Sequence, residues 1–101
     1  MNIQITTRHE SHISDDTKAF IEGEILGLEK FYDKITSAHI VCDRETHKNG
    51  TEDTVELDMS VDGATLSAKA TDENLGKALD AVIEKMTRQL KKKNEKVKEH
   101  K

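Results

Sequence analysis

The sequence predicts an α+β fold of order β-α-β-β-β-α, a two-layer sandwich with both helices on one face of a four-stranded mixed sheet. Four segments alternate between apolar and polar residues, two carry apolar residues at helical spacing, and turn signals separate them. A chain of 101 residues with 34% apolar and 36% charged residues suits one domain with a modest core. We therefore expect a single globular unit.

The first strand and the first helix are predicted near the start of the chain. Residues 2–7 alternate between apolar and polar side chains, which is the period of a half-buried strand. Ser14 is the predicted N-cap of a helix that runs to about Phe31, because its hydroxyl can accept a bond from a free backbone N–H. Gly23 and Gly27 weaken this helix, and we expect their small size to allow close packing. The expected apolar stripe comprises Phe20, Ile21, Ile25, Leu28 and Tyr32.

The next two strands are predicted at residues 36–45 and 55–61, where apolar residues again alternate with polar ones. Asn49 and Gly50 between them favour the positive φ angles of a tight hairpin. The polar stretch 43–54 is also compatible with a longer, mobile loop.

The fourth strand is predicted at residues 64–70, after a second hairpin signal at Asp62-Gly63. The first helix then crosses over to a parallel strand, and the last three strands form an antiparallel meander. With both helices on one face, the other face of the sheet should be polar and somewhat acidic. Residues expected there include Glu56, Asp58, Thr65 and Ser67.

A second helix follows, with Thr71 or Asp72 as its expected cap. Its apolar residues recur every three or four positions, at Leu75, Leu79, Val82, Met86 and Leu90. At 100° per residue, the opposite side of the helix is basic. Cations on that side are Lys77, Lys85, Arg88, Lys91, Lys92 and Lys96. We expect one domain over residues 1–93 and a frayed Lys/Glu-rich tail over residues 94–101.

Charge is strongly segregated along the chain. Residues 77–101 hold nine of the 16 Lys and Arg residues and four acids, a net charge of +5. The whole chain has a net charge of −4, so the remainder carries −9. Neutralisation of phosphates by Lys and Arg is the sequence-independent part of nucleic-acid binding, so this polarity indicates an RNA or DNA partner.

Several other functions are not predicted. His9, Glu10 and His12 lie at a strand end and in a short loop, which lack the fixed ligand pairing that zinc requires. Cys42 is alone, so we expect a small core residue rather than a disulfide or a reactive thiol. No Gly-rich phosphate loop, nucleophile elbow or paired-carboxylate motif is present, so we expect neither an enzyme nor a cofactor. We see no leader and no apolar span, and expect a cytoplasmic protein without a membrane partner.

Three segments resemble the short hibernation promoting factors and ribosome-associated translation inhibitors of the sigma-modulation protein family. Residues 5–9 (ITTRH) are similar to the family's opening strand, and residues 28–35 (LEKFYDKI) to the end of its first helix. Residues 79–90 (LDAVIEKMTRQL) are similar to its second helix. The family fold is β-α-β-β-β-α, similar to double-stranded RNA-binding domains, in agreement with the order predicted above.

The resemblance implies a monomer that binds the small ribosomal subunit and its rRNA in the channel for messenger and transfer RNA. Occupancy of that channel would block translation in starved or stationary cells, on whole ribosomes or ribosome dimers, without catalysis. The second helix would supply phosphate contacts, joined by basic positions of the first strand and the first helix. The predicted RNA-binding residues are Arg8, Lys30, Lys77, Lys85, Arg88, Lys91, Lys92 and Lys96.

The chain departs from the family pattern in three respects. Family members commonly carry several basic residues on the first helix, whereas residues 22–27 here contain Glu22 and Glu24, which predicts a narrower RNA surface. Gly76 stands where the family often has Tyr, which removes a stacking contact. The chain ends soon after the second helix, so we expect no C-terminal dimerisation domain, and any ribosome pairing would need ribosome contacts or another factor.

Two rival interpretations remain open at this stage. A double-stranded RNA-binding module would recognise A-form shape through phosphates and 2′-hydroxyls, with the same fold and basic helix. A protein-interaction module would instead use the acidic sheet and the hairpin around Asn49, and its lysines would only be solvated.

Overall fold

The structure is a computed structural model that describes residues 1–9 and 11–99, the last four as helical backbone only. It contains the predicted elements in the predicted order, with one short 3-10 helix added after the first helix. The elements are β1 (Asn2–His9), α1 (Asp15–Leu26), η1 (Gly27–Lys30), β2 (Ile35–His47), β3 (Gly50–Val61), β4 (Ala64–Asp72) and α2 (Leu75–Glu99).

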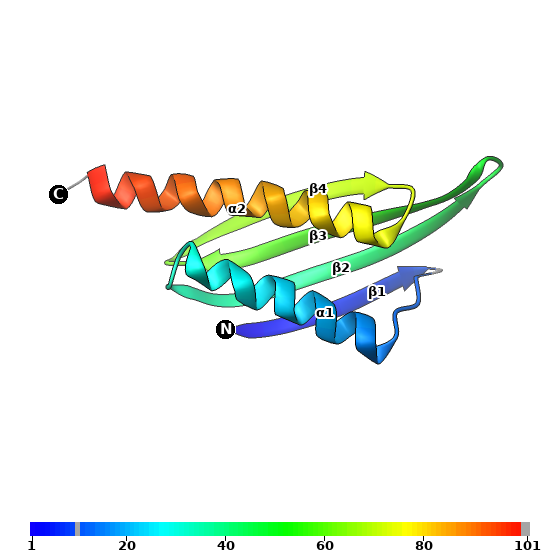
Figure 1. The fold of residues 1–101 in the computed structure, drawn as a ribbon, viewed down its shortest axis with the longest axis horizontal. Helices are drawn as coiled ribbons and strands as arrows, with labels where there is room; N and C mark the ends of the chain where they lie inside the picture. Colours follow the sequence, from blue (N-terminus) through cyan, green and yellow to red (C-terminus); the bar gives the residue numbers. More distant parts are fainter. Residues whose placement is uncertain (10, 100–101) are drawn as a thin grey trace.

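The four strands form one sheet in the order β1-β2-β3-β4. β1 is parallel to β2, and the other two pairs are antiparallel, as expected when α1 crosses over and the last strands form a meander. α1 and α2 both lie on the same face of this sheet (Figure 1). The predicted α+β two-layer sandwich is thereby confirmed.

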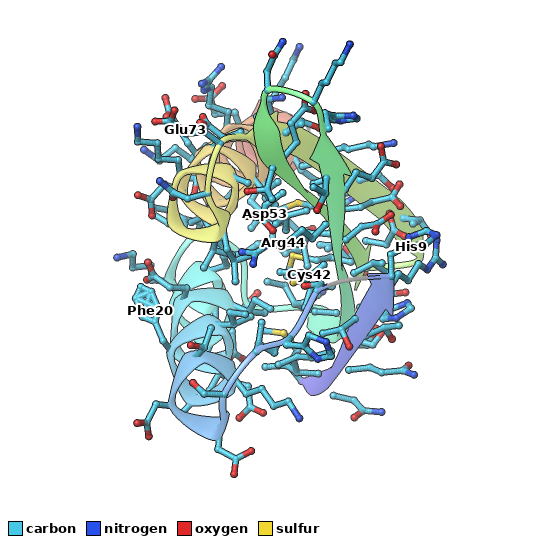
Figure 2. The ribbon with its side chains drawn as sticks, turned by 90° about the vertical axis from the view of Figure 1, so that its right-hand side faces the viewer. His9, Phe20, Cys42, Arg44, Asp53 and Glu73 are labelled. Atoms are coloured by element: carbon cyan, nitrogen blue, oxygen red, sulfur yellow. The ribbon has the colours of Figure 1, made fainter. Side chains whose placement is uncertain are left out.

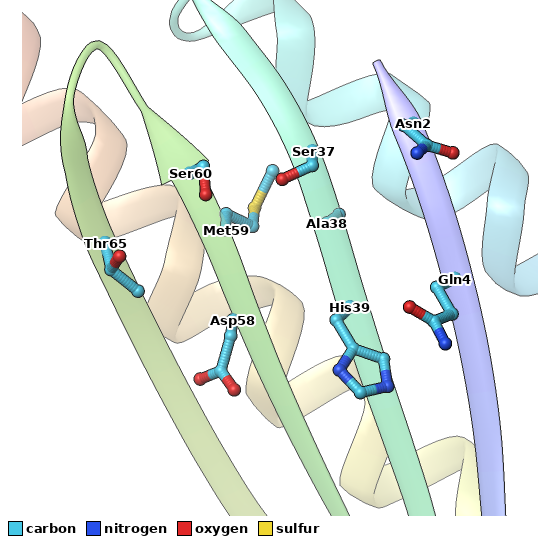
Figure 3. Close-up of a pocket in the computed structure, with 9 residues that line it drawn as sticks. All are labelled: Asn2, Gln4, Ser37, Ala38, His39, Asp58, Met59, Ser60 and Thr65. Carbon is cyan, nitrogen blue, oxygen red and sulfur yellow. The ribbon is translucent and has the colours of Figure 1, made fainter.

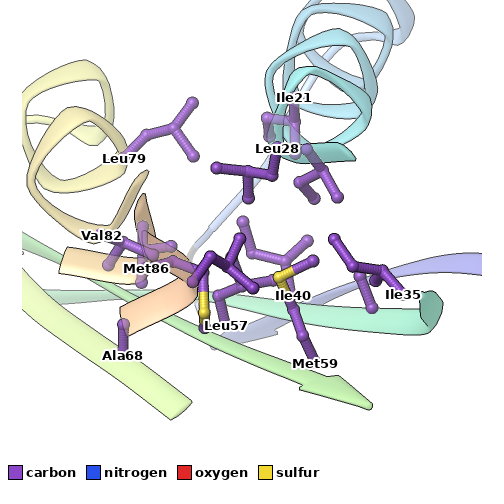
Figure 4. Close-up of a cluster of buried hydrophobic side chains, with 14 of the residues drawn as sticks. Ile21, Leu28, Ile35, Ile40, Leu57, Met59, Ala68, Leu79, Val82 and Met86 are labelled. Carbon is purple, nitrogen blue, oxygen red and sulfur yellow. The ribbon is translucent and has the colours of Figure 1, made fainter. Parts of the chain in front are cut away.

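The core lies between the sheet and the two helices. One register row crosses all four strands and brings apolar side chains side by side, from Ile5 through Ile40 and Leu57 to Ala68. α2 covers it with the predicted stripe, in which Leu90 is buried together with Leu79, Val82 and Met86. Figure 4 shows the last three of these side chains in the core. Full burial of such a side chain stabilises the fold by about 1.5–3 kcal/mol, so this stripe fixes which face of α2 remains outside.

The first helical region buries the predicted apolar stripe at every position except Phe20. Ser14 caps it as expected, since its hydroxyl accepts a hydrogen bond from the Thr17 N–H at 3.1 Å. Ile21 and Ile25 face the sheet and are fully buried. Phe20, expected on the apolar stripe, is 53% exposed because it lies about 100° around the helix from Ile21. That part of the predicted stripe is wrong.

The two glycines of the first helical region do not support close packing. A Cβ atom built at Gly23 or at Gly27 would meet no other heavy atom within 4 Å. Both positions therefore face open space, and the expectation that their small size brings two elements together is wrong. The last predicted turn of the helix forms as η1, whose end at Lys30 agrees closely with the expected end.

The cap of α2 is also corrected. Asn74, and not Thr71 or Asp72, accepts a hydrogen bond at its side-chain oxygen from the Lys77 N–H at 2.9 Å. Thr71 belongs instead to β4, where its hydroxyl lies 2.8 Å from that of Thr54 on β3. Strand pairing thus continues for two residues past the predicted end of β4.

The β2–β3 connection is a long hairpin and not a mobile loop. Pairing continues to His47 opposite Gly50, and Gly50 adopts a positive φ of 128° that favours glycine. The hairpin projects past the start of α2 at one end of a molecule that measures 54 × 25 × 18 Å (Figure 1).

α2 continues as helix to Glu99, and therefore includes residues 94–99 of the expected tail. Residues 100 and 101 lie outside the described residues.

Candidate nucleic-acid interface

Positive charge is concentrated in the second half of α2. Residues 85–99 hold seven Lys and Arg residues and two acids, a net charge of +5, whereas residues 75–84 hold one Lys and two acids. Cations near a helix C-terminus are favoured by the negative end of the helix dipole. The candidate interface is therefore at the C-terminal half of α2, at the opposite end of the molecule from the β2–β3 hairpin (Figure 1).

Two aromatic rings at the end of the first helical region connect it to this half of α2. The Lys30 and Lys91 ammonium groups lie 5.2 Å and 5.1 Å from the centre of the Phe31 ring. The Lys93 ammonium lies 5.9 Å from the centre of the Tyr32 ring. Such cation–π contacts orient the lysine side chains while they leave part of each ammonium in solvent. They gather cations from η1 and α2 on one surface.

Tyr32 is itself held in place. Its side chain is buried, and its hydroxyl donates a hydrogen bond to Asp62 at 3.0 Å. Burial, followed by the hydrogen bond to Asp62 and by nearby negative charge, raises the pKa of Tyr32. The tyrosine therefore stays neutral and links the end of the first helical region to the β3–β4 turn.

Other cations on α2 have partners within the protein. Arg88 pairs with Glu84 at 2.8 Å, and the Lys85 ammonium donates to the main-chain carbonyl of Lys69 at 2.7 Å. Lys92 is exposed and lines a hollow with Leu66, Gln89 and Lys93. We define the basic end as the six described cations on this half of α2 and on η1: Lys30, Lys85, Arg88, Lys91, Lys92 and Lys93.

Three predicted RNA-binding residues are not part of the described basic end. Lys77 lies in the first turn of α2 and forms an ion pair with Glu73, which raises the pKa of the lysine. By strand alternation, Arg8 falls on the open face of the sheet, away from both helices. The side chain of Lys96 lies outside the described residues. The sequence analysis did not include Lys93 among the binding residues. The Phe31-Tyr32 pair at the end of the preceding helix could have indicated it, because the Lys93 ammonium lies over the Tyr32 ring.

The remaining polar candidates form no further site. Cys42 is buried in the core, and burial together with the charge of Asp53 raises its pKa to about 11. Among residues 1–9 and 11–99, no three His, Cys, Asp or Glu residues are arranged to hold a metal ion. None of the helices in the described part is sufficiently long and apolar to cross a membrane.

The open face of the sheet carries a hollow lined mostly by polar residues, among them Gln4, His39 and Asp58 (Figure 3).

A mixed four-stranded sheet under two helices, one with a lysine-rich end, defines a small α+β domain with a surface suited to polyanions. The chain belongs to the sigma 54 modulation protein / S30EA ribosomal protein family, whose sequence model matches residues 3–98.

Two curated relatives and two solved structures resemble the chain. A ribosome hibernation promoting factor from Azotobacter vinelandii is 32% identical over 88 residues, which are 87% of this chain and 78% of the relative. One from Klebsiella oxytoca is 29% identical over 94 residues, 93% of this chain and 95% of the relative.

The solved structures show the same fold. A ribosomal subunit interface protein from Coxiella burnetii has a TM-score of 0.79 at 24% identity, over 93% of this chain and 98% of that one. The N-terminal domain of Thermus thermophilus Protein Y has a TM-score of 0.76 at 19% identity, over 91% and 98%. At these identities the likeness supports the fold alone.

Proposed function

We propose that this protein is a ribosome hibernation factor that binds the small ribosomal subunit in the channel for messenger and transfer RNA. It inhibits translation there by steric occupancy, under stress or in stationary phase, as a cytoplasmic monomer. Membership of the family and the names of the relatives support this function. The observation that carries it is the basic end, where cations of η1 and α2 converge around two aromatic rings.

The proposed mechanism is electrostatic docking without catalysis. The basic end neutralises phosphates of rRNA. Phe31 and Tyr32 orient the side chains of Lys30, Lys91 and Lys93 before binding, so less side-chain entropy is lost when rRNA binds. Because each phosphate contact releases counterions, binding is tight at low salt and readily reversed at higher salt. Whole ribosomes and ribosome dimers are both possible hosts for a domain that enters a preformed channel.

Co-sedimentation tests this function directly. Purified protein is mixed with separated subunits, with whole ribosomes or with an isolated RNA duplex, and each mixture is run on sucrose gradients at low and high salt. Migration with the small subunit and with whole ribosomes at low salt supports the proposal, and the ribosomal peak reports whether dimers form. Failure to migrate with either, or migration with an isolated RNA duplex alone, refutes it.

A charge-reversed variant then tests the docking surface. Lys91→Glu/Lys92→Glu should abolish co-sedimentation, since both ammonium groups belong to the basic end. Lys48→Glu/Lys77→Glu makes the same change of charge at the hairpin tip and in the first turn of α2, and should retain most of the binding. Equal loss in the two variants would mean that net charge, and not the basic end, governs binding.

A further inference from the structure

α1 carries two large apolar side chains that the described protein covers only in part. Phe20 is 53% exposed and Leu26 is 45% exposed, and they are the large hydrophobic residues found on the surface of the described chain. Figure 2 shows Phe20 projecting from α1 away from the sheet. Exposed aromatic and aliphatic residues that lie together mark interaction surfaces more often than residues scattered singly.

Phe20 and Leu26 belong to one row on the outer face of the helix. Phe20, Gly23 and Leu26 are spaced by three residues, so Phe20 and Leu26 each neighbour Gly23 and stand on either side of it, about 120° apart around the helix. Gly23 leaves the space between the two side chains open, because even a Cβ atom there would meet nothing within 4 Å. The row thus forms two apolar projections with a gap between them.

Carboxylates surround this row. α1 carries four acids and one Lys, a net charge of −3, in contrast to the positively charged second half of α2. Asp16 and Glu22 each lie one helical turn before an apolar side chain, Phe20 and Leu26 respectively. Neither carboxylate forms a hydrogen bond or ion pair with another described residue. Asp16 lies in the first turn of α1, where it suits the positive end of the helix dipole, but neither carboxylate is neutralised by a partner side chain.

We infer that the outer face of α1 is a docking surface for a basic, partly apolar segment of a ribosomal protein, while the basic end contacts rRNA. The inference rests on the proposed function and names a second partner for the bound domain. A phosphate backbone would be repelled by unpaired carboxylates beside Phe20 and Leu26, whereas a protein segment rich in Lys or Arg complements them. Its apolar side chains would enter the gap at Gly23.

The sign of a charge effect distinguishes a protein partner from RNA. Asp16→Asn/Glu22→Gln removes two negative charges beside the apolar row. If α1 faces a basic protein segment, this variant binds purified ribosomes more weakly, by about tenfold. If α1 faces rRNA, the same variant binds more tightly because repulsion is relieved. Glu45→Gln/Glu52→Gln is the matched control, with the same charge change on the β2–β3 hairpin and no weakening expected.

Removal of the apolar side chains gives an independent test. Phe20→Ser/Leu26→Ser should weaken ribosome binding by about tenfold with little change in melting temperature, since both side chains are exposed. In the ribosome complex, a photoreactive Phe20→p-benzoylphenylalanine variant should crosslink to a ribosomal protein.

The outcomes separate this inference from the proposed function. If the wild type binds ribosomes, equal or tighter binding of both α1 variants, or a crosslink from position 20 to rRNA, overturns the docking surface alone. If the wild type fails to bind ribosomes, the proposed function and the docking surface are both refuted.

Discussion

Two neighbouring side chains, Cys42 and Asp53, are both buried under the helices yet differ in charge. Cys42 is 1% exposed, and its thiol stays protonated because burial and the nearby Asp53 disfavour a thiolate. Asp53 is also 1% exposed, and its two oxygens accept hydrogen bonds from the Arg44 guanidinium at 2.9 Å and 3.1 Å. Figure 2 shows Arg44 beside Asp53, so a buried negative charge is compensated locally.

Cys42 should be almost unreactive in the folded protein. Its pKa of about 11, against an ordinary value of 9.0, lowers the thiolate fraction at pH 8 by about 100-fold, and burial slows access further. Iodoacetamide labelling at pH 8 should therefore be at least 100-fold slower in buffer than in denaturant. Stability linked to this thiol is complete below about pH 9 and is lost as the pH rises through about 11. Similar labelling rates in the two conditions would contradict the burial of Cys42.

Arg44 should be necessary for stability because of Asp53. Arg44→Ala leaves the buried carboxylate without its guanidinium partner, and we expect a loss of about 3 kcal/mol in the free energy of unfolding. Urea denaturation followed by circular dichroism measures it. Lys48→Ala at the exposed hairpin tip is the control and should change stability by less than about 0.5 kcal/mol. A loss below about 1 kcal/mol for Arg44→Ala would show that Asp53 does not depend on this ion pair.

At the scale of elements, the buried face of a helix was predictable where its apolar residues repeat regularly, and less so where they do not. α2 repeats its apolar residues every three or four positions, so its buried stripe from Leu79 to Leu90 followed from the sequence. α1 has Ala, Gly, Phe and Leu on several sides, so its apolar residues define no narrow stripe, and Phe20 was wrongly placed on the buried face. Asn74 was missed as a cap because Thr71 is an equally good cap locally, and only pairing with Thr54 places it in β4.

Gly23 in α1 and Gly50 in the hairpin should respond oppositely to alanine. Gly23→Ala should stabilise the protein by about 0.5–1 kcal/mol, because a helix-interior Cβ meets nothing there and alanine favours the helix. For a domain of this size, a gain of 1 kcal/mol raises the melting temperature by about 4–8 °C. Gly50→Ala should lower it, since alanine disfavours a φ of 128°. Calorimetry of the two variants checks both signs, and a lower melting temperature for Gly23→Ala would contradict its open surroundings.

At the scale of the whole molecule, charge is separated along the long axis. The basic end occupies η1 and the C-terminal half of α2, while the β2–β3 hairpin, which carries Glu45 and Glu52, projects at the other end (Figure 1). The lysines of α2 were predictable from helical spacing alone. The convergence of Lys30 and Lys91 on Phe31 was not, because it depends on how the two helices lie side by side on the sheet.

This separation predicts how salt weakens ribosome binding. If the six cations of the basic end each neutralise one phosphate, log affinity should fall against log salt with a slope of about −4 to −5. Lys91→Gln removes one contact and should make the slope less negative by about 0.7–0.9. Lys77→Gln removes the same charge from the same helix, but its ammonium is paired with Glu73 at the far end, so the slope should stay as in wild type. Titrations of fluorescently labelled protein with ribosomes over a salt series measure all three slopes. Equal changes in the two variants would mean that the phosphate contacts extend along the whole of α2, and a slope near zero would exclude phosphate docking by the basic end.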